Sequence, residues 1–307
     1  MKKILLAGAG GRLGAKVLDE LGRRGYGVRA LVRDASRLKD ARTRADVRVA
    51  DALSAESLRG ACDGVDAVVS TMGASLALGR TRGGAGFREV DLGANLNLLA
   101  EARRAGARKF VYVSLHGAER LRGLAYVDAH EEFVAALAAS GLDYTVVRPT
   151  GFFYVFEEIF KMAAARGRVV LVGDGSARTN PVHEEDLARE CADAVEVGER
   201  ELPVGGPETY TRREIAELAF SALGRRPRIT SLPPALVRTM IAPVRLFDRR
   251  LYDFLAFGAA VSTIDVVAPP AGGTSLRRHF RRLAGVESGA FGIHLTNAGK
   301  AAETGGF

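Results

Sequence analysis

A glycine-rich segment near the N-terminus has the composition of an anion-binding loop. It reads GAGGRLG from Gly8 to Gly14, directly after the apolar run Ile4–Ala7 and directly before an amphipathic helical pattern. In such a loop the first glycine permits a tight turn, Gly11 lets the backbone approach a pyrophosphate, and Gly14 lets the helix pack close to the strand. The helix N-terminus then supplies amide donors and its positive dipole end. The spacing G-x-x-G-x-x-G after a first strand therefore predicts a dinucleotide site, the alternative being a plain turn.

The end of the next apolar run carries two charges that bear on which dinucleotide binds. Arg33 and Asp34 stand 19 and 20 residues after Gly14. An acid at this place binds the ribose 2′-hydroxyl of NAD, whereas an arginine forms charge-assisted hydrogen bonds with the 2′-phosphate of NADP. Arg33 therefore predicts NADP(H), and Arg12 could close on the same phosphate from the loop. If Asp34 reaches the ribose instead, NAD is preferred; in a third interpretation both are solvated charges in a turn.

Alternating apolar runs and helical patterns must position these residues. The apolar runs predict strands at Ile4–Ala7, Val28–Val32, Val47–Val49, Ala67–Ser70, Phe110–Val113 and Tyr144–Val147. The intervening segments predict helices at Leu13–Arg24, Ala35–Ala41, Ala55–Gly60, Phe87–Ala105 and Val127–Ser140. This βαβ rhythm is typical of an α/β fold with a doubly wound parallel sheet, the Rossmann architecture.

The second half of the chain is less regular. It predicts a helix at Phe153–Arg166, a strand at Arg168–Val172, a turn at Gly173–Gly175 and helices at 184–197 and 211–223. From Pro234 to about Ala260, apolar residues recur at helical spacing among several arginines. This indicates a helix packed on a smaller region, with a substrate lid or a membrane-surface helix as alternatives. We expect a dinucleotide-binding core at 1–150, a smaller, mostly helical substrate-binding region at 151–284 interleaved with that core, and a flexible tail at 285–307.

Composition limits the class of protein. Apolar residues make up 47% of the 307 positions and only two are cysteines, which excludes a disordered or disulfide-stapled chain. Residues 1–50 hold 13 basic and five acidic side chains, an excess equal to the formal net charge of +8. Because this segment contains the glycine loop and lacks interleaved aromatic residues, an anionic cofactor explains it better than a nucleic acid does. The N-terminus does not resemble a signal peptide and no apolar stretch is long enough to span a membrane, so we expect a cytoplasmic protein. The histidines do not have metal-ligand spacing, so we expect no metal.

Motifs at the ends of the predicted strands together resemble the short-chain dehydrogenase/reductase superfamily, and within it the atypical NmrA-like branch. They are GAGGRLG, LVRD, Asp51-Ala52, Ser70-Thr71-Met72-Gly73 and FVYVS, and the resemblance covers about residues 1–200. It implies that Asp51 and Ala52 contact the adenine, that the segment 71–73 passes beneath the ribose and pyrophosphate, and that the segment 149–152 flanks the nicotinamide. The expected cofactor-binding residues are Gly8, Gly10, Gly11, Arg12, Leu13, Gly14, Arg33, Asp51, Ala52, Thr71, Met72, Gly73, Ser114, His130, Pro149, Thr150, Gly151 and Phe152.

The same resemblance implies a catalytic group. In relatives a serine polarises the substrate carbonyl, a tyrosine transfers a proton, and a lysine four residues later lowers the pKa of that tyrosine and holds the nicotinamide ribose. Ser114 and Tyr126 fit the first two roles, but position 130 is His130, one helical turn from Tyr126 on the same face. An imidazole could replace the lysine in part, or could simply pack in the core. Asp91 is expected near the active site, or as a carboxylate that complements its helix dipole.

The missing lysine bears on the direction of the reaction. A tyrosine with its ordinary pKa of about 10 is a poor base but an adequate acid, which favours reduction. We expect an NADPH-dependent reductase that acts on a carbonyl or conjugated double bond of a small apolar substrate. The alternative is a non-catalytic NADP-binding redox sensor or regulator. An epimerase or dehydratase needs an efficient base and is the least favoured.

Overall fold

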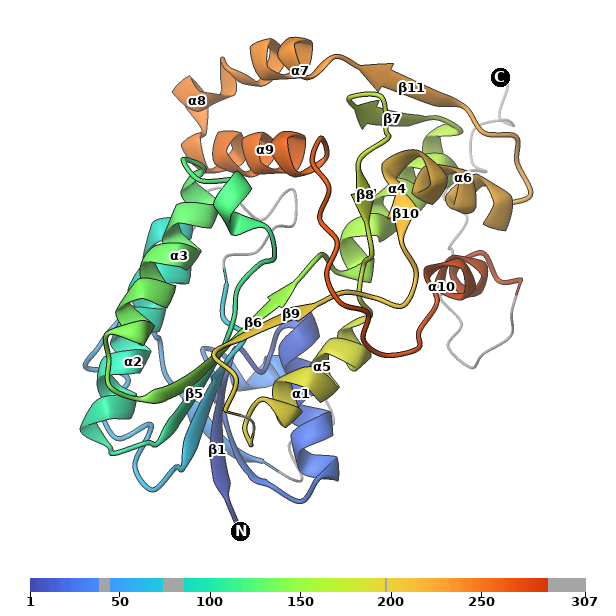
Figure 1. Ribbon diagram of the computed structural model, residues 1–307. Coiled ribbons are helices and arrows are strands. Elements are labelled where there is room, and N and C mark those ends of the chain that lie inside the picture. The colour runs from blue at the N-terminus through green and yellow to red at the C-terminus, as the bar shows by residue number, and fades with distance from the viewer. Residues whose placement is uncertain (39–44, 74–85, 197, 287–307) are drawn as a thin grey trace, which may run out of the picture.

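A seven-stranded parallel sheet forms the centre of the computed structural model, which describes residues 1–38, 45–73, 86–196 and 198–286 (Figure 1). Its strands lie in the order β3-β2-β1-β4-β5-β6-β9. Their bounds are β1 (Lys3–Ala7), β2 (Gly27–Val32), β3 (Asp46–Val49), β4 (Ala67–Ser70), β5 (Lys109–Val113), β6 (Asp143–Pro149) and β9 (Glu201–Val204). This order confirms the expected doubly wound α/β sheet and places a switch point between β1 and β4, where such sheets bind ligands.

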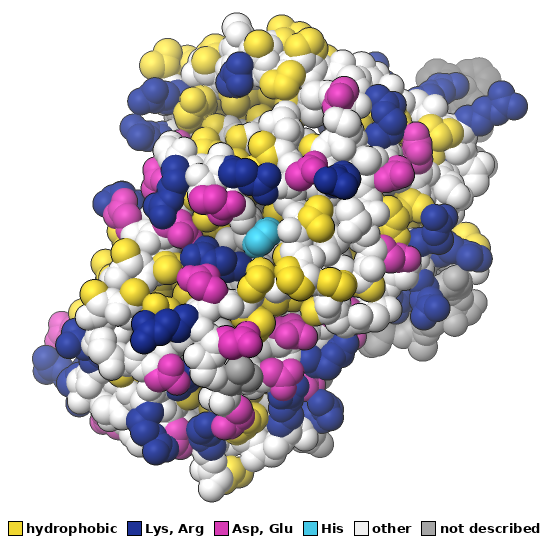
Figure 2. Space-filling view, in the orientation of Figure 1, with side chains coloured by type: hydrophobic (Ala, Val, Ile, Leu, Met, Phe, Trp, Pro, Cys, Tyr) yellow, Lys and Arg dark blue, Asp and Glu magenta, His cyan; other side chains and the backbone are white. Residues whose placement is uncertain are grey.

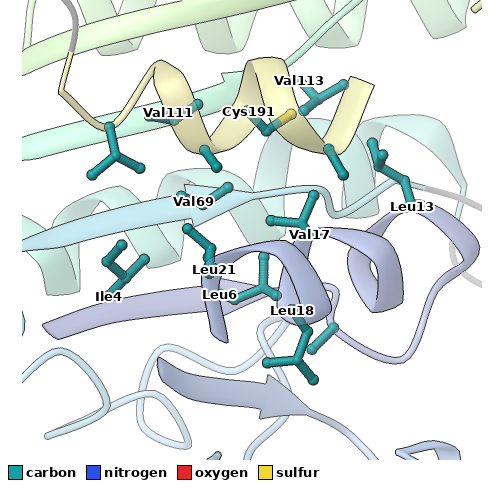
Figure 3. Close-up of a cluster of buried hydrophobic side chains, with 14 of the residues drawn as sticks. Ile4, Leu6, Leu13, Val17, Leu18, Leu21, Val69, Val111, Val113 and Cys191 are labelled. Carbon is teal, nitrogen blue, oxygen red and sulfur yellow. The ribbon is translucent and has the colours of Figure 1, made fainter. Parts of the chain in front are cut away.

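Helices cover both faces of this sheet because successive strand residues point to opposite sides. Ile4 and Leu6 enter one core together with α1 (Arg12–Arg23) and α5 (Glu184–Asp193), which pack on each other (Figure 3). Leu5 and Ala7 enter the opposite core. That side is covered by α2 (Asn95–Arg104), which continues the π-helical η3 (Arg88–Ala94), and by α3 (Ala125–Ala138). Because both faces are buried, the central strands read as continuous apolar runs.

The two edge strands differ from what the sequence predicts. The five central strands are confirmed, whereas β3 is present but mostly exposed rather than buried. The seventh strand, β9, was not predicted. It pairs only with β6, is partly exposed, and contains Pro203, which a central strand would not accommodate. Such a short edge strand has neither the apolar run nor the alternation that would reveal it.

Two predicted helices in the first half are wrong. Residues 55–64 form consecutive turns instead, and Gly60 within them has a left-handed φ of +78°. A left-handed residue ends helical geometry, so no helix runs through this segment. The helix predicted at Ala35–Ala41 is only the single 3₁₀ turn η1 (Ala35–Arg37), because Leu38 leaves helical geometry; residues 39–41 lie outside the described part.

A smaller region stands beside the carboxyl end of the sheet. Phe153, Phe156, Phe160, Phe220 and Phe280 are buried in its core. Its elements are α4 (Phe153–Arg166), the parallel pair β7 (Val169–Val172) and β11 (Ile229–Leu232), the antiparallel pair β8 (Arg178–Thr179) and β10 (Tyr210–Thr211), α6 (Arg212–Ala222) and α10 (Leu276–Leu283). The chain thus returns to the sheet for α5 and β9 between parts of this region (Figure 1). Its role in binding substrate stays a prediction, and almost all of the predicted tail lies outside the described residues.

Residues 234–261 form three helices instead of the single one expected, namely α7 (Pro234–Ile241), α8 (Val244–Phe247) and α9 (Arg249–Val261). Pro243 lies between α7 and α8, where the first helix ends. Asp248 lies between α8 and α9 and caps α9 by accepting a hydrogen bond from the Leu251 amide at 2.9 Å. α9 contacts α3 of the sheet domain and not just the smaller region, contrary to the prediction. Nowhere in the described ranges is a helix both long and apolar enough to cross a membrane.

Candidate functional site

The glycine loop has the close contacts that its sequence predicts. Gly8 has a φ of +84°, and the Gly11 amide donates to the Gly8 carbonyl at 2.9 Å. A Cβ on Gly14 would lie 2.0 Å from that carbonyl oxygen, so only glycine fits. Within the described residues no side chain caps α1 and its first turn holds no acid. The loop therefore offers backbone amides and a positive helix end to an anion, which is the cradle that a dinucleotide pyrophosphate requires.

The segment after β4 lies directly against this loop, as predicted. The Thr71 hydroxyl donates to the Ala7 carbonyl at 3.1 Å, and a Cβ on Gly8 would lie 2.7 Å from that hydroxyl oxygen. Met72 and Gly73 follow, after which residues 74–85 lie outside the described part. The ends of β1 and β4 therefore meet at the switch point of the sheet, where the resemblance implies that the dinucleotide lies.

The charges after β2 favour a phosphate over a free ribose. Both carboxylate oxygens of Asp34 are occupied locally, because they accept from the Ser36 amide at 2.9 Å and the Ser36 hydroxyl at 2.7 Å. Arg33 is exposed beside them. A second exposed arginine, Arg37, lies over the loop, since its Cβ would be 2.9 Å from a Cβ on Gly10. Sequence reasoning missed Arg37, although its place four residues after Arg33 was a usable signal.

Two of the predicted loop residues point away from the anion cradle. The Arg12 guanidinium lies 3.3 Å from a Glu157 carboxylate oxygen and 5.2 Å from the centre of the Tyr154 ring, both on α4. It is therefore turned toward the smaller region in this structure, rather than placed with Arg33 as expected. The Leu13 side chain is buried in the core beneath α1, so only its backbone can contact a cofactor.

Asp51 and Ala52, which are expected to contact the adenine, form a turn that is held by a side chain of α2. The Asn97 side-chain amide donates to the Ala52 carbonyl at 3.0 Å and to the Leu53 carbonyl at 3.2 Å. Asp51 is exposed and accepts from the Leu53 amide at 3.1 Å. Asn97 is thus a positioning residue for this turn, a role that its sequence did not reveal.

The segment Pro149–Phe152 leads from β6 into the smaller region. The Thr150 hydroxyl donates to the Asn180 carbonyl at 2.5 Å, which ties the segment to residues 180–182. Gly151 has a φ of +149°, and a Cβ there would touch the Phe156 ring at 3.4 Å. Phe152 stacks on Tyr154 with ring centres 5.1 Å apart. An aromatic wall therefore follows directly on the residues expected to flank the nicotinamide.

Three of the four predicted catalytic residues come together. His130 is buried, and its Nε2 lies 3.2 Å from Asp91 Oδ1 while its Nδ1 lies 2.6 Å from the Tyr112 hydroxyl. The Asp91 contact is close but not aligned as a hydrogen bond. The Tyr126 ring meets the His130 ring edge-on at 4.6 Å. Asp91 Oδ1 would also lie 3.0 Å from a Cβ on Gly73, so this cluster adjoins the segment after β4.

The electrostatics of the cluster keep its tyrosines protonated. Burial raises the pKa of Tyr126 well above its ordinary value of 10, and the nearby Asp91 carboxylate raises it further. The same two causes, again with burial first, raise the pKa of Tyr112 well above 10. Both phenols therefore stay neutral near pH 7, so Tyr126 carries a proton there and cannot act as a base.

The fourth predicted catalytic residue, Ser114, belongs to a different cluster. Its hydroxyl donates to Glu131 at 3.3 Å and accepts from Arg148 at 3.4 Å, and these two charges pair with each other at 2.6 Å. Across the described part of the chain, no hydrogen bond joins Ser114 to Tyr126 or His130. Its role in polarising a carbonyl stays a prediction. Tyr112 and Glu131 were both missed, because each lies within a segment that reads as ordinary strand or helix.

Apolar side chains surround Tyr126. The Tyr126 ring centre lies 5.2 Å from that of Phe87 and 4.6 Å from that of Phe257 of α9, and Phe254 packs against the same cluster of Phe87 and Ala129. Two surface hollows, of about 280 Å³ at Tyr210 and about 440 Å³ at Phe220, belong to the smaller region and share none of these residues.

No three His, Cys, Asp or Glu side chains in the described ranges are grouped to hold a metal ion.

Comparison with known proteins gives one family and several distant relatives. The profile of an NAD(P)H-binding family matches residues 8–198. The divinyl chlorophyllide a 8-vinyl-reductase of Oryza sativa subsp. indica is 32% identical in an alignment of 264 positions that covers 80% of this chain and 64% of that protein. The photosystem II assembly factor Ycf39 of Synechocystis sp. is 26% identical over 269 residues, 85% of this chain and 80% of that protein. The chain spans somewhat less than two thirds of the vinyl-reductases that it matches.

Solved structures with the same fold include enzymes of more than one kind. An NADPH-dependent quinone oxidoreductase from Escherichia coli, complexed with NADPH, superposes with a TM-score of 0.75 at 22% identity, covering 91% of this chain and 99% of that one. A nucleoside-diphosphate-sugar epimerase from Staphylococcus aureus superposes with a TM-score of 0.71 at 18% identity, covering 92% and 100%. At these identities the likeness shows the fold.

Proposed function

The chain belongs to the NAD(P)H-binding family within the short-chain dehydrogenase/reductase superfamily, and we propose that it is an NADPH-dependent reductase in which Tyr126 donates the proton. The predicted superfamily and the predicted class of cofactor are thereby confirmed. The proposal rests on the cluster of Asp91, His130 and Tyr126, which adjoins the segment after β4. This cluster holds a neutral phenol near the carboxyl end of the sheet, where the glycine loop also lies.

The residues around the glycine loop fit the phosphorylated dinucleotide. The uncapped start of α1 would hold the pyrophosphate, and the Gly8–Gly14 contact leaves room for it. Arg33 and Arg37 would hold the 2′-phosphate, since Asp34 is already used within its own turn. When bound, NADPH supplies a hydride to the substrate. The chain itself binds the cofactor, excludes water with the aromatic wall and holds a proton at the Tyr126 hydroxyl.

The surroundings of Tyr126 support an apolar substrate. Phe87 and Phe257 contact the ring, Phe254 packs against the same cluster, and the Phe152–Tyr154 stack begins within the expected nicotinamide segment. A carbonyl or conjugated double bond that accepts a hydride needs a proton to complete its reduction, and a protonated Tyr126 can give one. The names of two relatives point the same way, since one is a vinyl-reductase and one a quinone oxidoreductase.

The test is turnover of NADPH with quinones and conjugated ketones as acceptors, in the native protein and in Tyr126→Phe. General acid catalysis contributes about 10²- to 10⁴-fold, so kcat should fall by about that much while the dissociation constant for NADPH stays within about twofold. Tyr144→Phe is the matched control, because that phenol lies on β6 beside Arg200 and should leave both values unchanged. Unchanged turnover in Tyr126→Phe would remove the assignment of the proton donor.

One observation favours a second candidate, a protein that holds NADP(H) without turnover and signals its redox state. The residue four after Tyr126 is a histidine whose two ring nitrogens face Tyr112 and Asp91, so it does not stand free as a lysine amine would. The relatives also include a photosystem II assembly factor. This candidate predicts no NADPH consumption with any acceptor, together with different affinities for NADPH and NADP.

A further inference from the structure

The corner formed by α7 and α8 exposes more apolar surface than any other described stretch of comparable length. Leu236, Met240, Leu246 and Phe247 are 46%, 62%, 83% and 88% exposed, and they fall within 12 residues. The other exposed large apolar side chains of the described residues are scattered singly or in pairs. An exposed apolar patch of this kind is typical of a surface that binds a membrane or another protein.

No element of the described residues buries this corner. None of α7, α8 and α9 contains a buried residue, and α7 and α8 stand at the outer end of the molecule (Figure 1). Figure 2 shows apolar side chains gathered at the same end, with basic side chains at its margin. The corner could therefore enter a soft apolar layer without displacing any other element.

The charges that accompany the apolar residues are almost all positive. Residues 234–250 hold four arginines and one acid, and the acid, Asp248, is used to cap α9. Arg238 and Arg245 are exposed within the corner, and Arg249 follows it. Exposed leucine and phenylalanine side chains beside arginines are the combination that binds anionic lipid, where the apolar groups enter the acyl boundary and the guanidinium groups meet the headgroups.

We propose that the α7–α8 corner is a docking surface for a membrane that contains anionic lipids. Binding is peripheral, through Leu246 and Phe247 inserted at the tip and Arg238 and Arg245 held against the headgroups. α9 continues from this corner to Tyr126, where its Phe257 lies 4.6 Å from the tyrosine ring. Docking would therefore place the aromatic enclosure of the site next to the lipid boundary, from which apolar molecules could enter. The docking itself does not depend on the proposed reductase activity.

The experiment is flotation of the full chain with phosphatidylcholine vesicles, with and without phosphatidylglycerol. We expect binding to the anionic vesicles alone, weakened by salt. Leu246→Glu should weaken vesicle binding about tenfold or more, because it replaces an inserted apolar side chain with a negative charge that the anionic headgroups repel. The matched control is Leu96→Glu, which alters an exposed leucine on α2, remote from the corner, and should bind as the native chain does.

The electrostatic part is tested separately. Arg238→Gln and Arg245→Gln should each weaken binding about fivefold. Arg103→Gln, which changes an exposed arginine of α2, is the control and should have no effect. Equal binding to neutral vesicles, no binding at all, or Leu246→Glu binding like the native chain would each overturn the proposal. So would a native dimer that Leu246→Glu dissociates without vesicle binding, because the corner would then be an interface between two copies of the chain.

Discussion

Glu157 should contribute a pH-dependent part of the stability of this protein. Its carboxylate accepts from His279 of α10 at 3.1 Å and pairs with Arg12 of α1 at 3.3 Å, so one side chain of α4 joins three helices. The hydrogen bond with His279 lowers the pKa of Glu157 from its ordinary value of 4.5 to about 2, with the charge of Arg12 helping and burial opposing. The side chain is 15% exposed, so solvent screens these interactions little.

The magnitude follows from the change in pKa. At about 1.4 kcal/mol for each pKa unit, a pKa of about 2 in place of 4.5 corresponds to roughly 3 kcal/mol of unfolding free energy. Because the pKa is lower in the folded state, this stabilisation is fully present above pH 4.5. It is lost as the pH falls toward 2, where the carboxyl group takes up a proton in the folded protein as well.

The assay is urea unfolding of the native chain, Glu157→Gln and the matched control Glu158→Gln, from pH 7 down to pH 3. Glu158 is the adjacent residue of α4, is 63% exposed and pairs only with Lys161 in the next turn. We expect Glu157→Gln to lose about 2–3 kcal/mol at pH 7, and Glu158→Gln to lose at most about 0.5 kcal/mol. The deficit of Glu157→Gln should shrink below pH 4.5. A deficit independent of pH, or equal losses in the two variants, would refute the reasoning.

Three further outcomes can be measured with the purified protein. Arg33→Ala should weaken NADPH binding about tenfold or more in a fluorescence titration and leave NADH within about twofold, since only the former carries the 2′-phosphate. Gly14→Ala should abolish dinucleotide binding and lower the melting temperature, because its Cβ would lie 2.0 Å from a loop carbonyl. Gly22→Ala on the same helix meets nothing within 4 Å and should be neutral or stabilising by up to about 1 kcal/mol. Burial raises the pKa of Cys62 and Cys191 to about 12, so neither thiol should react with a disulfide reagent at pH 8 before unfolding.

The parts of the fold that the sequence predicts are those where burial controls residue choice. The five central strands are buried over most of their length, so each contains an apolar run that is visible in the sequence. β3 and β9 lie at the edges, where this constraint is relaxed; one is exposed and the other contains Pro203. The breaks at Pro243 and Asp248 were readable signals, since a proline and a capping acid are ordinary helix boundaries.

In the candidate site too, features set by neighbouring residues in the chain could be predicted, and features set by tertiary packing could not. The close contacts of Gly8 and Gly14 were predictable because they depend on the strand and helix next to these residues in the chain, whereas the role of Arg33 stays a prediction. The contact of His130 with Tyr112 was not predictable, because Tyr112 comes from β5 and meets it only through the packing of α3 on the sheet, whereas Asp91 was expected near the active site only through the resemblance. Spacing places a residue on a helix face; it does not say which strand that face will meet.

The arrangement around His130 changes where the binding energy for the cofactor must come from. A lysine at this position has a long chain and a free amine, which can reach a ribose hydroxyl. His130 is shorter, and its Nδ1 is already bonded to the Tyr112 hydroxyl, so only the buried Nε2, which lies 3.2 Å from Asp91 without an aligned hydrogen bond, remains for such a contact. By contrast, no side chain in the described residues caps the start of α1 beside the glycine loop, and Arg33 and Arg37 are both exposed. The adenosine diphosphate half of the cofactor should therefore supply most of the affinity, while the nicotinamide half is positioned by the aromatic wall and by Tyr126.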